Sequence, residues 1–164
     1  MSAPPAIRVV PVTPVLRDAV LRLRTRPEQD VFVSPPTITL PDAEQCPDST
    51  PMAILLDDTP VGYYRIEHSA RSVTGRDVDA SALGLRSFQL DGAWQGRGLG
   101  TRALSAACAD LVTRFPQARR LLLTVNCDNA AALALYLRHG FEDGGELYHG
   151  GRSGPQHLLS RPLP

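Results

Sequence analysis

A glycine-rich segment in the middle of the chain has the residue types and spacing to bind a phosphate group. The segment Gln95-Gly96-Arg97-Gly98-Leu99-Gly100 follows residues 85–90, which alternate like a strand, and precedes apolar residues at helical spacing from 99 to 115. A strand that turns through three glycines into a helix gathers backbone N–H groups at the positive end of the helix dipole. We therefore expect this corner to bind phosphate; a tight turn without a ligand is the alternative.

Two common phosphate-binding motifs do not fit this segment. A Walker A loop ends in Gly-Lys-Ser or Gly-Lys-Thr, and the chain contains no lysine. The Rossmann fingerprint is Gly-x-Gly-x-x-Gly in an early βαβ unit, whereas this segment reads Gly-x-Gly-x-Gly and comes late in the chain. The sequence excludes a P-loop nucleotidase and does not favour a Rossmann site.

A second block of residues could act beside the phosphate site. After the strand-like residues 121–125 the chain reads Asn129-Ala130-Ala131-Ala132-Leu133-Ala134-Leu135-Tyr136, and then Gly140-Phe141. Tyr136 follows Asn129 by about two helical turns, so both side chains are expected on one helix face. Asparagine commonly caps a helix, and a phenol can donate a proton.

Together the two blocks resemble the GCN5-related N-acetyltransferase (GNAT) family. The family pattern of Gln/Arg-x-x-Gly-x-Gly/Ala, followed by Asn-x-x-Ala-x-x-Leu-Tyr and Gly-Phe, is met at every position. This resemblance covers residues 52–141. Residues 28–33 resemble, more softly, the Gln-x-x-Phe-Val segment of the diamine (polyamine) acetyltransferase branch.

The resemblance implies a fold and a reaction. The fold would be a three-layer α/β/α sandwich whose mixed, mostly antiparallel sheet has six to seven strands and is splayed at the cofactor slot. Residues 1–164 would form one domain, with 1–51 on the acceptor side and 82–141 as the acetyl-CoA-binding core. The reaction would be acetyl-CoA-dependent N-acetylation by direct transfer in a ternary complex.

The resemblance also implies which residues bind acetyl-CoA. The main chain of Phe88, Gln89 and Leu90 would pair with the pantetheine arm, and Asn129 would hydrogen-bond the cofactor or cap its helix. The phosphates would lie on the glycine turn, formed by Gln95, Gly96, Arg97, Gly98, Leu99, Gly100 and Thr101. Arg97 and Arg102 are near enough to add charge, although both could equally be solvated surface residues.

Catalysis would need a proton donor and a route for the amine proton. The family's matching tyrosine protonates the departing thiolate, which assigns that role to Tyr136; a core aromatic is the alternative. Many family members place a glutamate on the strand before the turn, where this chain has Gln89. Glu67 is the replacement base we expect, with Glu28, Asp91 or a chain of water molecules as alternatives. Cys127 is interpreted as buried filler rather than a nucleophile.

The expected acceptor is a small-molecule primary amine such as a polyamine. That expectation comes from the Gln29–Val33 match and from four acids that could pair with a cation: Glu28, Glu142, Asp143 and Glu146. An acetyltransferase for a protein N-terminus or an antibiotic amine stays open. So does a non-catalytic regulatory module that binds coenzyme A, although an intact Tyr136 argues against it.

Composition limits the other classes of function. Seventeen basic and seventeen acidic residues give a net charge of zero, so nothing points to nucleic acid. Three cysteines without a Cys-x-x-Cys pair support neither a disulfide framework nor a zinc site, and we predict no metal. Residues 1–5 lack a leader pattern and no apolar run has membrane-spanning length, so we expect a cytoplasmic protein, with a homodimer left open.

Local patterns predict the elements that position these residues. Thr13-Pro14 opens a helix to about residue 24, residues 27–30 could begin a short one, and 52–56 with 61–67 form a hairpin. Prolines between Ser34 and Pro51 favour a loop with at most one helical turn. Residues 71–79 are expected to be a loop. The remaining elements are expected to be strands at 6–12, 82–90 and 120–125, helices at 98–115 and 129–139, and a closing hairpin of 141–148 with 156–161.

Overall fold

Seven strands form one mixed sheet in the computed structural model, which describes residues 4–151 and 153–164. The strand order is β1-β2-β3-β4-β5-β7-β6, and every neighbouring pair is antiparallel except β4 with β5. The strands are β1 (Ile7–Pro11), β2 (Ser49–Leu56), β3 (Thr59–Glu67), β4 (Ala82–Leu90), β5 (Arg120–Asn126), β6 (Glu142–Tyr148) and β7 (Gln156–Pro162). The described residues leave out residues 1–3, part of the segment in which no leader pattern is expected. They also leave out Arg152, which falls in the expected closing turn.

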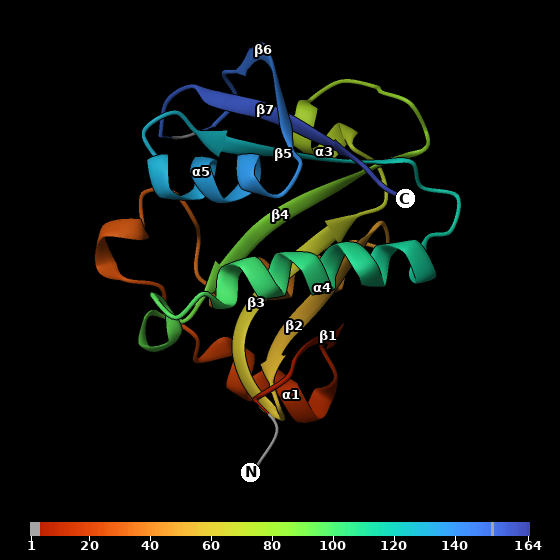
Figure 1. Cartoon of the computed structure of the whole chain (residues 1–164). Helices are drawn as coiled ribbons and strands as arrows, with labels where there is room; N and C mark the ends of the chain where they lie inside the picture. The colour runs from red at the N-terminus through yellow and green to blue at the C-terminus, as the bar shows by residue number, and fades with distance from the viewer. Residues whose placement is uncertain (1–3, 152) are drawn as a thin grey trace.

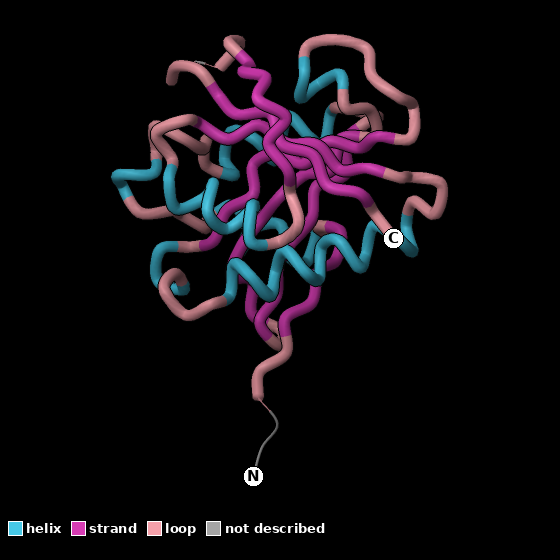
Figure 2. The backbone as a smooth tube through the Cα atoms, turned by 45° about the horizontal axis from the view of Figure 1, so that its top comes forward, coloured by secondary structure: helices cyan, strands magenta, loops and turns pink. Residues whose placement is uncertain are grey.

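Helices cover both faces of this sheet, as a three-layer sandwich requires. Figure 1 shows α4 (Leu99–Arg114) in front of the sheet and α1 (Pro14–Leu21) behind it. The α4 face, which also receives α5 (Ala130–Arg138), holds the largest apolar cluster, and α1 with α2 (Pro36–Gln45) packs on a second, smaller one. In Figure 2 the strands run through the middle of the molecule with helices around them. Among the described residues, none of the helices is long and apolar enough to span a membrane.

The expectation of a loop between Ser34 and Pro51 is wrong, because residues 36–45 form helix α2. Pro36 is the first residue of the helix, where a backbone N–H would have no hydrogen-bond partner within the helix in any case. Pro41 lies inside the helix and removes one backbone hydrogen bond. Leu40 and Ala43 are buried, and burial of such side chains offsets that loss.

The expected loop at 71–79 is also partly helical. Residues 71–74 form the single turn α3 (Arg71–Thr74), which ends at Gly75 with a left-handed φ of 76°. Val73 and Thr74 are buried, so packing holds this turn. Two short 3₁₀ turns complete the fold: η1 (Pro27–Gln29), where a short helix is predicted, and η2 (Gly92–Trp94).

The sheet opens between β4 and β5. These strands pair only where Ala82–Gly84 lies beside Arg120–Leu122, and β4 then runs away from β5 (Figure 1). On its other edge β4 carries a bulge: Tyr63 pairs with Gln89 and Arg65 with Arg86, so Ser87 and Phe88 together oppose one residue. Ser87 has a φ of 60°, which is rare for a residue other than glycine. The expected splay is therefore present, with a bulge at the same place.

A buried ion-pair network fixes β3 against the acceptor-side segment. Arg65 is 2% exposed, and its guanidinium lies 2.7 Å from both Glu67 and Asp42. The Glu67 carboxylate also accepts a hydrogen bond from Ser49 at 3.2 Å and lies 3.4 Å from Arg86. The positive charges of two guanidinium groups, Arg65 and Arg86, thus balance the negative charges of two carboxylates. Of the four side chains, that of Asp42 is the most exposed.

We expect Glu67→Ala to lower the free energy of unfolding by about 3 kcal/mol, because it leaves the buried Arg65 without its inner carboxylate. Asp42→Ala is the matched control. It removes the exposed partner of the same guanidinium and should cost less than about 1 kcal/mol. Urea-induced unfolding of both variants measures the difference, and equal losses would show that Glu67 has no special part in the network.

Candidate functional site

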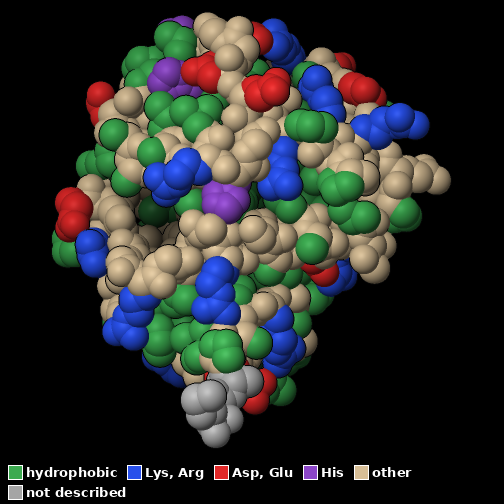
Figure 3. All heavy atoms as spheres, viewed as in Figure 1, with side chains coloured by type: hydrophobic (Ala, Val, Ile, Leu, Met, Phe, Trp, Pro, Cys, Tyr) green, Lys and Arg blue, Asp and Glu red, His purple; other side chains and the backbone are tan. Residues whose placement is uncertain are grey.

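A cavity of about 730 Å³ occupies the opening between β4 and β5. One group of lining residues comes from the α4–α5 side, including Leu99, Gly100, Ala132 and Tyr136. A second group comes from the acceptor-side segment and lies near α1 and α2, including Gln29, Phe32, Val33, Ser34 and Thr39. The cavity therefore reaches both layers of helices through the split in the sheet. Figure 3 shows a hollow on the left of the viewed face, between α5 and the glycine turn.

The glycine turn forms the corner that the sequence predicts for a phosphate. Gly96 and Gly98 have left-handed φ angles of 78° and 74°, and Gly98 caps α4 without any side-chain hydrogen bond. A Cβ built on Gly98 would meet no atom within 4 Å, so the protein leaves that space open. The N–H groups of the first turn of α4 are available to an anion there. Gln95, Gly96, Gly98, Leu99, Gly100 and Thr101 all line the cavity.

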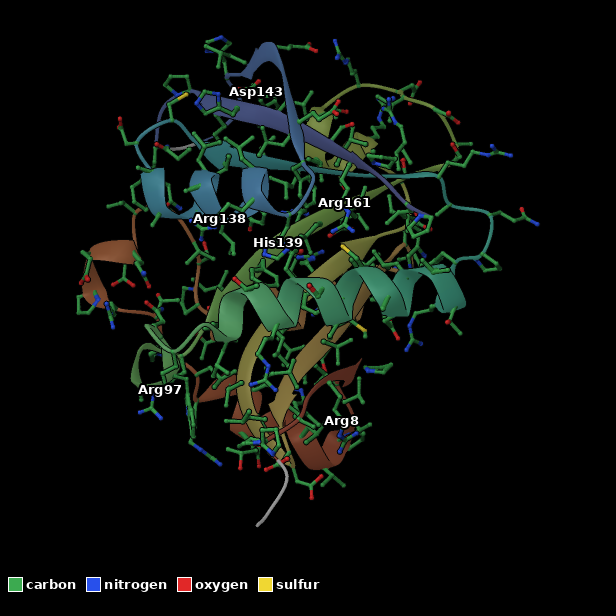
Figure 4. The ribbon with its side chains drawn as sticks, in the orientation of Figure 1. Arg8, Arg97, Arg138, His139, Asp143 and Arg161 are labelled. Atoms are coloured by element: carbon green, nitrogen blue, oxygen red, sulfur yellow. The ribbon has the colours of Figure 1, made fainter. Side chains whose placement is uncertain are left out.

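The two arginines near this turn do not face the cavity. The Arg97 guanidinium lies 5.0 Å from the centre of the Trp94 ring, and Figure 4 shows this side chain at the outer end of the turn. Arg102 donates a hydrogen bond to the carbonyl of Pro5. Neither residue is among those lining the cavity, so a phosphate contact from either would need its side chain to move.

Gln95 connects the glycine turn to the acceptor-side segment. Its carboxamide exchanges two hydrogen bonds with that of Gln29, at 2.8 and 3.0 Å, and donates a third to the carbonyl of Leu90 at 2.9 Å. These bonds occupy the side chain. Gln95 therefore holds the glycine turn in place. Gln29 contributes to the site by hydrogen-bonding Gln95.

The edges of the split strands form the expected slot. Phe88, Gln89 and Leu90 line it from β4, and Leu123, Thr124, Val125 and Asn126 line it from β5. Backbone groups on these edges have lost their neighbouring strand, so an extended ligand can pair with them. Asn129 lines the same cavity, and its Oδ1 accepts a hydrogen bond from the N–H of Ala132 at 3.4 Å. The capping role that the sequence allows for Asn129 is therefore present.

Tyr136 brings a phenol to the wall of the cavity. It is 8% exposed and packs edge-on against Phe88 and Phe141, with ring centres 6.3 and 5.5 Å away. Burial raises the pKa of the Tyr136 phenol, because the charged form would lose its hydration. The hydroxyl therefore stays protonated at neutral pH and can donate a proton or a hydrogen bond.

The structure does not bring Glu67 to the cavity, although the sequence suggests it as the base. Its carboxylate is enclosed by Arg65, Arg86 and Ser49, and it is not a lining residue. Asp91 accepts hydrogen bonds from the N–H groups of Arg24 and Ala93 and does not line the cavity either.

Two further residues that the sequence singles out also lie off the cavity lining. Glu28 is exposed beside Gln29, and Cys127 is a half-buried free thiol. Neither one is a lining residue.

The acids expected to bind a cationic acceptor also lie elsewhere. Asp143 lies 2.9 Å from His157, and Glu146 lies 2.6 Å from Arg76. Glu142 is exposed on β6. Among the described residues, no carboxylate lines the cavity.

Sequence reasoning missed two arginines that do line it. Arg86 lies on β4 with its side chain 41% exposed, held against Glu67 at 3.4 Å. Arg138 ends α5, where Figure 4 shows it. Strict alternation along β4 would put Arg86 on the same face as Phe88, and the bulge at residues 87 and 88 moves it to the opposite face, so the pattern alone does not locate it. No signal in the sequence shows that the end of α5 borders the cavity.

Comparisons with known proteins agree with this geometry. Residues 17–141 match the model of the acetyltransferase (GNAT) family. The chain is 32% identical to the uncharacterized N-acetyltransferase YbbJ of Bacillus subtilis over 114 residues, which cover 70% of this chain and 71% of that protein. It is 29% identical to the spermine/spermidine N(1)-acetyltransferase of the same organism over 146 residues, covering 87% and 91% of the two chains.

The fold also matches solved acetyltransferases. The structure of the aminoglycoside acetyltransferase AAC(6')-Ib, in complex with paromomycin and acetyl-CoA, superposes with a TM-score of 0.76 at 20% identity. That alignment covers 96% of this chain and 93% of the other. The family match extends over most of the chain and includes the glycine turn, both edges of the slot and Tyr136. This chain belongs to the acetyltransferase (GNAT) family.

Proposed function

We propose that this protein is an acetyl-CoA-dependent N-acetyltransferase of a small-molecule primary amine, acting by direct transfer in a ternary complex. One observation carries the proposal: a single cavity joins the glycine corner and Tyr136 on one side of the split sheet to the acceptor-side segment on the other. Such a cavity lets two substrates meet from opposite faces. The three free cysteines fit a reducing compartment, and we place the activity in the cytoplasm.

The residues of the slot suit the parts of acetyl-CoA. The N–H groups at residues 96–101 would hold its phosphates, and the open edge at residues 88–90 would pair with its pantetheine amides. Asn129 would reach the cofactor from the start of α5. When bound, acetyl-CoA supplies the activated acetyl group as a thioester.

Tyr136 is the proton donor in this proposal. The amine nitrogen bonds to the acetyl carbon as the carbon–sulfur bond breaks, and the thiolate that leaves takes a proton from the phenol. Burial keeps the phenol protonated and removes competing water. It also makes the phenol a weaker acid, so the transfer depends on the leaving thiolate lying in the same dry site, where its pKa rises too.

For the acceptor we propose a polyamine. The likeness to the spermine/spermidine acetyltransferase supports this class, as does the part that Gln29 plays in the site. The likeness to the aminoglycoside enzyme supports an antibiotic amine as the second candidate. Neutral polar groups and two arginines, but no carboxylate, line the described cavity, so hydrogen bonds from the neutral groups would supply most of the recognition.

Gly98→Val should weaken acetyl-CoA binding by about tenfold or more, since the new side chain fills the space left for phosphate and displaces hydrogen bonds to a charged group. Gly145→Val is matched in backbone strain: its φ is 85° and its Cβ would also meet nothing within 4 Å. It should keep wild-type affinity. Calorimetric titration with acetyl-CoA checks both variants, and unchanged affinity in Gly98→Val would remove the phosphate site from this turn.

Tyr136→Phe should lower kcat by about 10²–10⁴ while the affinity for acetyl-CoA hardly changes, because it deletes only the proton donor. Tyr64→Phe is the control, since the Tyr64 hydroxyl is buried without a described hydrogen-bond partner and lies outside the cavity lining. Its kcat should match the wild type. Thiol release assays give both numbers, and turnover within threefold of wild type in Tyr136→Phe would exclude the acid role.

A panel of amines should identify the acceptor class. We expect spermidine and spermine to give the highest kcat/KM, above kanamycin and above a short peptide with a free N-terminus. Released thiol is the readout, with acetyl-CoA saturating. Preference for kanamycin or for the peptide would replace the polyamine assignment, and no turnover on any amine would favour a coenzyme-A-binding module.

A further inference from the structure

Gln89 lines the cavity from β4, on its acceptor side. It pairs with Tyr63 across β3 and β4, and directly opposite residues share a face of the sheet. Tyr63 packs with Val20 and Leu40 under α1 and α2, whereas Phe88 packs on the α4 side. The Gln89 side chain therefore lies on the face opposite Tyr136.

The Gln89 carboxamide is held in one orientation and has an unused acceptor. Gln89 is 5% exposed, and its Nε2 donates to the carbonyls of Ser34 at 3.1 Å and Ser87 at 3.0 Å. Both of these residues also line the cavity. Two bonds to carbonyl oxygens identify Nε2 as the donor end of the amide. Oε1 is buried and has no hydrogen-bond partner in the described structure, which is unfavourable for a buried acceptor.

In the part of the chain that the structure describes, no carboxylate near Gln89 lines the cavity as an available base. Glu67 and Arg65 on β3 pair with each other, and Asp42 on α2 pairs with Arg65. Glu28 and Asp30 are exposed and flank Gln29, and neither is a lining residue. The titratable or charged residues that do line the described cavity are Arg86, Tyr136, Arg138 and Tyr148.

We propose that the Gln89 Oε1, which must shift toward the cavity when the acceptor binds, accepts a hydrogen bond from the N–H of the acceptor amine, and that the enzyme takes this amine in its neutral form rather than deprotonating it with a carboxylate. This inference rests on the proposed function. The amide positions the nitrogen and stabilises the positive charge that grows on it during attack. An amide cannot take up the proton, because its oxygen is far too weakly basic.

The proton count closes without a carboxylate base. A neutral amine forms the nitrogen–carbon bond as the carbon–sulfur bond breaks, after which the nitrogen releases one proton and the thiolate gains one. Tyr136 gives its proton to the thiolate and recovers one from the nitrogen. The protein therefore ends each turnover in its starting protonation state.

The first test is the pH profile of the wild type with one series of acceptors. The best amine of the panel is compared with analogues fluorinated beside the reacting nitrogen, since fluorine lowers the amine pKa with little change of shape. Log kcat/KM should rise with pH and level off at a point that moves with the amine pKa. Levelling off at one fixed pH for all analogues would reveal a base on the enzyme and overturn the proposal.

The second test removes the amide. Gln89→Met keeps the length of the side chain, and it should lower kcat/KM for every acceptor by about 10- to 100-fold with an unchanged pH profile and acetyl-CoA affinity. A loss below threefold would overturn the hydrogen bond. Gln89→Glu should add a second change of kcat/KM with pH, at a pH that is the same for all amines whatever their pKa. A wild type that acetylates no amine would overturn the proposed function as well, whereas turnover with a fixed pH break overturns only this inference.

Discussion

The separation of β4 from β5 is the constraint on which the rest of this structure depends. The two strands pair over three residues of β4, Ala82–Gly84, and the bulge at Ser87 and Phe88 then bends β4 away from its neighbour. A separated strand leaves backbone N–H and C=O groups without partners, which is costly inside a protein unless a ligand supplies them. The cavity and the slot are consequences of this one break in the ladder.

At this opening, β4 places side chains of the site on both faces of the sheet. Side chains alternate along a strand, so Phe88 packs toward α4 and Tyr136 while Gln89 faces the acceptor-side segment. Opposite faces keep the two substrates apart until they meet in the opening. A phenol that burial keeps protonated lies on one side, and an unused amide oxygen lies on the other. We propose that these two groups divide the proton donation and the positioning of the amine between them.

Contacts between distant parts of the chain hold the acceptor side in place. The Gln29–Gln95 amide pair joins residues 66 positions apart and ties η1 to the glycine turn. The network of Asp42, Arg65, Glu67 and Arg86 joins α2 to β3 and β4. The charged groups of this network are paired with one another. The Glu67 carboxylate is therefore occupied by arginines and is not available as a base, although it lies near the site. Arg86 is the member that reaches the cavity.

The sequence by itself determined the elements with strong local patterns. These include β4 at Ala82–Leu90, α4 after the glycine turn, and the helix caps at Thr13 and Asn129. It also determined the family, because spacing within two short blocks carries that information. Tertiary packing decided the rest. Helix α2 forms despite Pro41 because Leu40 packs against residues of β2 and β3 that lie later in the chain. Glu67 is enclosed by arginines, and Arg86 and Arg138 reach the cavity, because charges and cavities depend on distances in space that spacing along the chain does not contain.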